Sequence, residues 1–212
     1  MSLKSVLACL AAISVTVPIA AAAMPPADSW EIGPNIRGRN YSVGMPSQPT
    51  QLPGGGLSFE FPRANGEVDA LTTGIRPLSQ VREITIRYRI DATRGTRFIS
   101  AETPEQTATI SFYLQRSGDN WSARGRYASY RWYVPQHAVI PLAPGERSIT
   151  VRLDETWTNV NGVPNTRDPQ GFVTALANTA RFGIAFGTAG ARSHGVYATG
   201  PARFTLLSVG MR

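Results

Sequence analysis

The chain has 212 residues and a formal charge of +7, from 21 basic and 14 acidic residues. This length predicts one domain of sandwich or barrel size, or two small ones. Lys4 is the only lysine, and the arginines are spread from Arg37 to Arg212 instead of forming a basic run. With no basic run and no nucleic-acid motif, the positive charge does not predict a nucleic-acid partner.

The first 23 residues have the features of an export signal. Lys4 supplies a positive charge, residues 5–19 are mainly apolar, and the alanines that follow suit a signal peptidase. The apolar run is short for a membrane span of about 20 residues, and Pro18 interrupts it. We therefore expect residues 1–23 to be a signal peptide and residues 24–212 to be one secreted or periplasmic domain, with no membrane span after cleavage.

The single cysteine, Cys9, lies inside this signal segment. The tetrapeptide Val6–Cys9 resembles a lipoprotein cleavage box, but it comes before a full apolar region has formed, so simple cleavage is favoured over lipidation. The mature chain would then have no disulfide and no thiol nucleophile. A chain of about 190 residues can bury a sufficient core without disulfides.

Stretches in which apolar and polar residues alternate run through the rest of the chain and predict strands. The clearest is Glu83–Ile90, where the apolar residues would face a core while Arg87 and Arg89 would face water. Turn residues separate this stretch from similar ones at Leu57–Phe61, Thr107–Gln115, Ser148–Leu153, Arg181–Phe186 and Ala202–Met211.

One segment has helical features instead. Asp168 can cap a helix, Pro169 suits its first position, and Phe172 and Leu176 would share one face. These residues predict a short helix at Pro169–Thr179. About nine strands and a single helix predict a mostly-β fold, an antiparallel β-sandwich.

The sequence contains no complete catalytic group, so no catalytic residue is assigned and an enzyme is not favoured. His137 and His194 are the only histidines, and neither has the spacing of a metal-ligand pair. Glu67 and Asp69 begin the row of acids that some sandwich glycosidases carry along one strand, but Leu71 occupies the third position. No metal or cofactor is expected, although loop carboxylates and carbonyls could hold a structural calcium.

The segment Trp121–Tyr133 combines five aromatic residues with three arginines. If residues 127–134 form a strand, Trp132 would face the core while Tyr127, Arg131 and Tyr133 would share an exposed face. Aromatic rings can stack on the C–H face of a sugar, and arginine can bind its polar or acidic groups. The alternative is that these aromatics pack under a loop or at a sheet edge.

Two tryptophans are further candidates for a sugar-stacking surface. Trp121 opens the aromatic segment, and Trp157 lies in the turn after the strand predicted at Ser148–Leu153. The predicted ligand-binding residues are therefore Tyr127, Arg131, Tyr133, Trp121 and Trp157.

The C-terminal third carries a resemblance to a known family. The segments Phe182–Gly187, Ser193–Gly200 and Ala202–Leu206 resemble the end of galactose-binding-like jelly-roll domains, a group similar to carbohydrate-binding modules. The resemblance implies a jelly roll and makes carbohydrate binding the leading class of function, but it transfers no ligand residue. In this part of the chain, Gly195 would allow a tight turn and His194 would hold it by a backbone hydrogen bond.

Three functions remain open on this basis. The leading one is an exported, non-catalytic domain that binds a polysaccharide or other glycan. The second is a polysaccharide lyase or glycoside hydrolase of sandwich fold, which needs acidic or Tyr/His/Arg groups within reach of one sugar ring. The third is a structural envelope protein that binds no small ligand.

Overall fold

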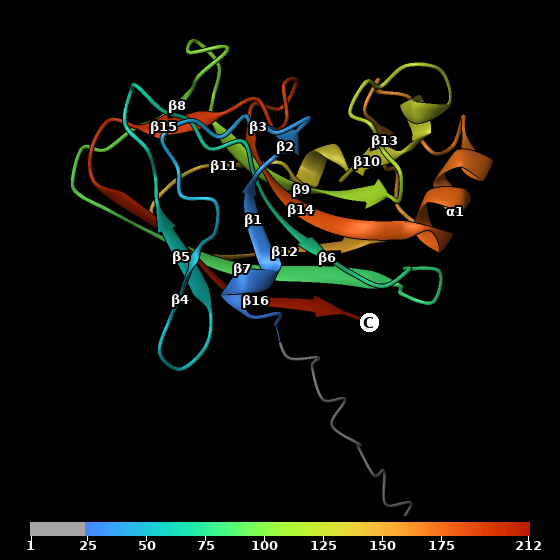
Figure 1. Cartoon of the computed structure of the whole chain (residues 1–212), viewed down its shortest axis with the longest axis horizontal. Helices are drawn as coiled ribbons and strands as arrows, with labels where there is room; N and C mark the ends of the chain where they lie inside the picture. The colour runs from blue at the N-terminus through green and yellow to red at the C-terminus, as the bar shows by residue number, and fades with distance from the viewer. Residues whose placement is uncertain (1–23) are drawn as a thin grey trace, which may run out of the picture.

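The computed structural model describes residues 24–212, so the predicted signal peptide and Cys9 lie outside the described residues. Residues 24–212 form two main antiparallel sheets that pack face to face (Figure 1). In this part of the chain, no helix is long and apolar enough to cross a membrane.

The first sheet, called the site sheet below, contains β1, β6, β14, β9, β10 and β13 in that order, with β11 paired beside β9. Their bounds are β1 Trp30–Gly33, β6 Ala70–Gly74, β9 Thr109–Arg116, β10 Arg131–Tyr133, β11 Ile140–Pro141, β13 Thr158–Asn159 and β14 Thr179–Gly187.

The second sheet has the order β12, β7, β16, β5 and β4. Its strands are β4 Thr50–Gln51, β5 Leu57–Glu60, β7 Glu83–Ala92, β12 Gly145–Arg152 and β16 Ala202–Met211. In Figure 1, β9 and β14 of the site sheet run above β7 and β16 of the second sheet. The chain passes repeatedly from one sheet to the other, and the predicted mostly-β antiparallel sandwich with one short helix is confirmed.

Short elements complete the fold. Two small two-stranded sheets pair β2 (Asn35–Ile36) with β3 (Arg39–Asn40), and β8 (Phe98–Ser100) with β15 (Val196–Ala198). Single turns of 3₁₀ helix are η1 (Ala27–Ser29), η2 (Gly125–Ser129) and η3 (Gln136–Ala138).

The predicted alternation of β7 is confirmed by burial. Ile84, Ile86, Tyr88 and Ile90 are at most 1% exposed, whereas Arg87 and Arg89 face water. β9 differs from this pattern because both of its faces are buried: Ile110 and Phe112 lie in the core between the sheets, and Ser111 and Tyr113 are covered on the outer face. Loops must therefore cover the outer face of the site sheet, where a free face was expected.

The only α-helix of the described chain, α1, spans Pro169–Ala177 and confirms the predicted helix, which ends two residues earlier than expected. The Asp168 carboxylate accepts a hydrogen bond from the Gly171 N–H at 2.9 Å, which caps the helix. Phe172 is buried against Trp132 and Trp157, with ring centroids 5.0 and 5.9 Å away. The helix thus closes one end of the sandwich.

The strand predicted over residues 127–134 is wrong in its first half. Residues 125–129 form the 3₁₀ turn η2, and only Arg131–Tyr133 pair with β9. β9 ends at Arg116, whose N–H donates to the Tyr130 carbonyl at 2.7 Å, so the residues before Tyr130 have no strand to pair with. They turn back on themselves instead, and the Tyr130 N–H donates to the Tyr127 carbonyl at 3.2 Å.

Candidate functional site

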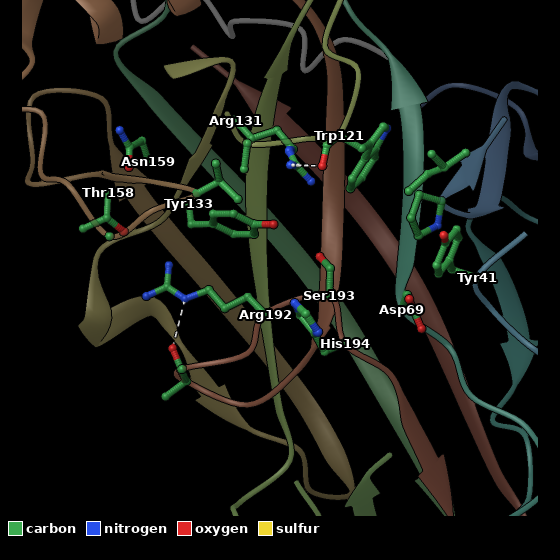
Figure 2. Close-up of a pocket in the computed structure, with 17 residues that line it drawn as sticks. Tyr41, Asp69, Trp121, Arg131, Tyr133, Thr158, Asn159, Arg192, Ser193 and His194 are labelled. Atoms are coloured by element: carbon green, nitrogen blue, oxygen red, sulfur yellow. Dashed lines mark hydrogen bonds between the residues drawn. The ribbon is translucent and has the colours of Figure 1, made fainter. Parts of the chain in front are cut away.

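A cavity of about 660 Å³ lies over the outer face of the site sheet, the face turned away from the second sheet. Loops from distant parts of the chain enclose it. Its walls are formed by Pro34, Ile36, Tyr41, Asp69, Trp121, Ala123, Arg131, Tyr133, Thr158, Asn159, Val160, Gly162, Ala189, Gly190, Arg192, Ser193 and His194. In Figure 2, Tyr133 and Arg192 lie on one side, Tyr41 and Asp69 lie on the other, and Ser193 and His194 lie between them.

Tyr113 forms a rigid base beside this cavity. It stands opposite Tyr133 on β10 and Gly183 on β14. A side chain at position 183 would overlap the Tyr113 ring, so only glycine lets the ring lie across β14. Its hydroxyl then reaches Thr72 on β6, 3.0 Å away. The ring is fully buried, which raises the pKa of the Tyr113 hydroxyl and keeps it neutral.

Trp121 stands on this base and is held from several directions. Its ring meets Tyr113 edge to face, with centroids 6.3 Å apart. The Arg131 guanidinium stacks on it, with 4.1 Å between the guanidinium carbon and the ring centre. The Trp121 backbone has φ +64°, a conformation that costs free energy for a residue other than glycine. Its N–H donates to the Asp119 carboxylate at 3.0 Å, which stabilises this turn.

Arg131 and Asp119 form a buried ion pair beneath Trp121. Nε of Arg131 lies 2.8 Å from Oδ2 of Asp119, and both side chains are at most 5% exposed. Gln115 donates to the same carboxylate oxygen at 3.0 Å. The charge of Arg131 is therefore neutralised inside the protein, and the contribution of Arg131 to a binding site is to position Trp121.

Tyr133 and Arg192 form the opposite wall. The Tyr133 ring packs against Tyr113 at 5.4 Å, and the Arg192 guanidinium lies 5.6 Å from the Tyr133 ring centre. Arg192 donates to the Val134 carbonyl at 2.8 Å and to the Gln136 side chain at 3.2 Å, and it takes part in none of the ion pairs of residues 24–212. Burial lowers the pKa of Arg192. Because Arg192 forms none of these ion pairs, a ligand group beside it would meet a cation without a bound counter-charge.

Asp69 lies at the other end of the cavity and is 6% exposed. Burial, and after it the negative charges of Glu67 and Glu102, raise the pKa of Asp69 to about 8. Burial also raises the pKa of Glu67, with Glu102 adding to the effect while His194 and Arg39 oppose it. Asp69 is therefore mainly a neutral carboxylic acid at pH 7.

The predicted site residues separate into two groups. Trp121, Arg131 and Tyr133 line the cavity together. Arg131 and Tyr133 lie on the predicted outer face, but loops cover it and the two residues are only 4% and 6% exposed, so the predicted exposed surface is wrong. Tyr127 does not line it, because η2 turns its ring toward Tyr130, with centroids 5.0 Å apart. The assignment of Trp157 is corrected by its burial.

Trp157 is 0% exposed and belongs to the core. Its ring packs against Phe112 and Phe172 at 5.9 Å, and its indole N–H donates to the Arg152 carbonyl at 3.0 Å. The turn after β12 therefore directs this ring under α1, where no sugar can reach it.

His194 also differs from the expectation for its turn. Gly195 has φ +80°, as the predicted tight turn requires, and a side chain there would overlap Glu67. The His194 ring, however, contacts the Glu102 carboxylate through Nδ1 instead of holding the backbone. Among residues 24–212, no group of three or more His, Cys, Asp or Glu side chains is arranged to hold a metal ion.

The residues that the sequence did not single out as ligands are Tyr41, Asp69, Arg192 and Ser193. Asp69 carried a signal, as half of the Glu67–Asp69 pattern. The others lie in loops with no periodicity, and only folding brings them to one cavity. The glycines that flank Ser193 in sequence indicated a loop there, but not that the loop would line a cavity.

A scan of protein-family models found no match, and neither did a search of curated proteins. Among solved structures, the chain is similar to CBM28, a carbohydrate-binding module specific for non-crystalline cellulose, at 14% identity and a TM-score of 0.41, covering 90% of this chain and 94% of that one.

A second similar structure is a xylanase 10C variant from Cellvibrio japonicus in complex with xylopentaose, at 12% identity and a TM-score of 0.37, covering 86% of this chain but only 28% of that one. A third comes from work on endo-acting O-glycanases of the human gut microbiota, at 12% identity and a TM-score of 0.39, covering 89% and 94%. At these identities and TM-scores, no fold family, role or ligand residue is carried over to this chain.

Proposed function

We propose that the chain is an exported glycan-binding domain, secreted or periplasmic, whose ligand occupies the cavity over the site sheet. The observation that carries this proposal is the support of Trp121. A buried ion pair, a cation–π contact and an edge-to-face contact hold a partly exposed indole ring in a strained turn at the cavity wall. Strain of this kind persists only where the surrounding structure fixes it, and it is concentrated at functional sites.

The chemistry of the walls suits a sugar. The partly exposed Trp121 ring and the exposed Tyr41 ring offer apolar surfaces for the C–H faces of pyranoses, and the largely buried Tyr133 ring lines the opposite wall. Polar side chains in the cavity walls, among them Asn159 and Arg192, offer donors for the hydroxyl groups of a sugar. An apolar cavity with a few converging polar groups is the usual form of a small-ligand site.

The proposal is tested by affinity electrophoresis and calorimetry of residues 24–212 with soluble β-glucan, xylan, galactan and polygalacturonate. We expect at least one polysaccharide to bind, and Trp121→Ala to weaken that binding at least tenfold, which corresponds to about 1.4 kcal/mol. Tyr127→Ala is the matched control, since it removes an aromatic ring outside the cavity and should leave binding unchanged. Binding that survives Trp121→Ala, or no binding by any of the four, would overturn the proposal, and the second result would favour a structural envelope protein.

A glycoside hydrolase is the second candidate function, and one observation favours it. Asp69 faces the cavity with a raised pKa, and a general acid must be protonated before it can protonate a leaving group. Its nearest acid in sequence, Glu67, does not line the cavity, which is why binding is the leading function. Release of reducing ends from a bound polysaccharide, abolished by Asp69→Asn, would establish hydrolysis, and a lack of release by the wild type would dismiss it.

A further inference from the structure

Two residues that line the cavity each have a buried oxygen atom that lacks a hydrogen-bond partner among residues 24–212. They are Oδ1 of Asp69 and Oγ of Ser193. Both residues line the same cavity, and Figure 2 shows Ser193 near its centre and Asp69 on the side of Tyr41. A buried polar atom without a partner costs on the order of 1–3 kcal/mol, so two of them at one cavity indicate a ligand that supplies the partners.

Backbone hydrogen bonds fix Asp69, while Oδ1 of its side chain has no hydrogen-bond partner among residues 24–212. The Asp69 N–H donates to the Ser42 hydroxyl at 2.9 Å, and the Asp69 carbonyl accepts from the Phe186 N–H at 2.9 Å. The terminal torsion of an Asp side chain is broad, so a small rotation turns either oxygen toward the cavity. Ser193 has φ +61°, which makes it one of only four residues other than glycine with positive φ in the described chain.

The charged groups around Asp69 affect whether its carboxyl group is protonated. Glu67 and Glu102 are negative and disfavour a second charge beside them, while His194 contacts Glu102 and Arg39 acts on Glu67. Tyr41 stands on the same side of the cavity as Asp69, and Tyr133 and Arg192 stand across it. None of the ion pairs of residues 24–212 includes Asp69, so no cation holds its carboxylate in the charged form.

We propose that Asp69 and Ser193 form a hydroxyl-binding subsite in which Asp69 acts as a neutral carboxylic acid. A protonated carboxyl group donates one hydrogen bond and accepts another, and a serine hydroxyl does the same. Two neighbouring hydroxyls of a sugar ring can use both the donors and the acceptors of that pair, whereas a carboxylate or a sulfate uses only the donors and a metal ion only the acceptors. This inference rests on the proposed function and adds the orientation of the ligand, with its ring against the aromatic wall and its hydroxyls toward Asp69.

The test is the pH dependence of affinity, measured by calorimetry between pH 5.5 and 9.5 with soluble β-glucan, xylan and galactan as neutral probes. Wild-type affinity should fall at least tenfold as Asp69 loses its proton, because a carboxylate can no longer donate and carries an unpaired charge. Asp69→Asn keeps an N–H donor and a carbonyl acceptor at all pH values, so its affinity should change less than twofold over the range. Glu146→Gln, which removes an exposed acid on the second sheet, should retain the wild-type profile.

The outcomes separate the two proposals. A flat wild-type profile, or the same fall in Asp69→Asn, would overturn the subsite even where Trp121→Ala abolishes binding and the glycan-binding function stands. Tighter binding of polygalacturonate than of every neutral probe at pH 6, dependent on Asp69, would also overturn it. If none of the probes binds at any pH, both proposals fall.

Discussion

The guanidinium carbon of Arg131 lies 4.1 Å from the centre of the Trp121 ring, while Nε of the same side chain lies 2.8 Å from Oδ2 of Asp119. One arginine therefore joins a buried carboxylate to a partly exposed indole. Because Asp119 also accepts the Trp121 N–H, ring and backbone are held by the same ion pair. The sequence suggested Arg131 as a ligand residue, and its place in the structure makes it a positioning residue.

Replacing Arg131 by Met tests that role. Removing one partner of a buried ion pair leaves Asp119 without a counter-charge, so we expect a loss of about 3–5 kcal/mol in the free energy of unfolding, together with weaker glycan binding. The double variant Arg131→Met/Asp119→Asn removes the unpaired charge and should recover part of the stability, measured by urea unfolding, without recovering affinity. Arg126→Met is the control, because it removes a cation–π contact outside the cavity, and it should change neither the free energy of unfolding nor the glycan affinity. Full affinity in the double variant would contradict the role of Arg131.

Gly183 is expected to be intolerant of any side chain. Gly183→Ala places a methyl group where the Tyr113 ring lies, so the ring must move and its hydrogen bond to Thr72 lengthens or breaks. Crowding of this kind costs typically about 1–3 kcal/mol, to be measured by urea unfolding. Gly190→Ala is the matched control, since nothing lies within 4 Å of the added carbon. Equal stability of the two variants would show that Tyr113 is not fixed across β14.

The raised pKa of Asp69 makes stability depend on pH with a definite sign. The folded protein keeps this proton up to about pH 8, whereas the unfolded chain loses it near the ordinary value of 3.8. Between about pH 4 and 8 the folded state therefore binds more protons, and this group lowers the free energy of unfolding as pH rises. Asp69→Asn lacks the effect, so its stability relative to wild type should increase with pH across that window and level off above it. A difference that is constant with pH would contradict the assignment.

The two tryptophans that the sequence suggested as sugar platforms should behave in opposite ways. Trp157→Ala removes a fully buried ring from between Phe112 and Phe172 and should cost about 3–5 kcal/mol of stability. Trp121→Ala should leave most of the stability and remove the binding. Thermal unfolding and affinity electrophoresis of both variants provide the comparison, and a stable Trp157→Ala protein with lost binding would reverse our assignment.

Long segments with a regular two-residue period were predicted more accurately than short ones. β7 and β14 carry their large apolar residues at every second position, so the face of each that packs in the core could be predicted from residue order alone, although the outer face of β14 is buried as well. For β10 the period was right only for Arg131–Tyr133, because the pairing partner β9 ends and the chain before Tyr130 must turn. Periodicity describes the faces of a strand but does not say where its neighbour stops.

The cavity itself could be predicted only in part. Trp121 and Tyr133 are conspicuous in sequence, but Tyr41 and Arg192 reach the same cavity from loops separated by 150 residues of chain. Such proximity depends on turns like the one at Gly195, whose geometry is fixed by its neighbours in space. Trp157 was misassigned for the same reason, because a turn residue can point into the core as readily as into solvent.

The most direct test of glycan binding is a ¹H–¹⁵N spectrum of the indole N–H groups during a titration with the polysaccharides. The chain has four tryptophans, and Trp30, Trp132 and Trp157 are at most 1% exposed, so they serve as internal controls for Trp121. We predict that the Trp121 signal, assigned with Trp121→Phe, shifts progressively to saturation while the other three move far less. A bound polysaccharide that leaves the Trp121 signal in place would contradict the account.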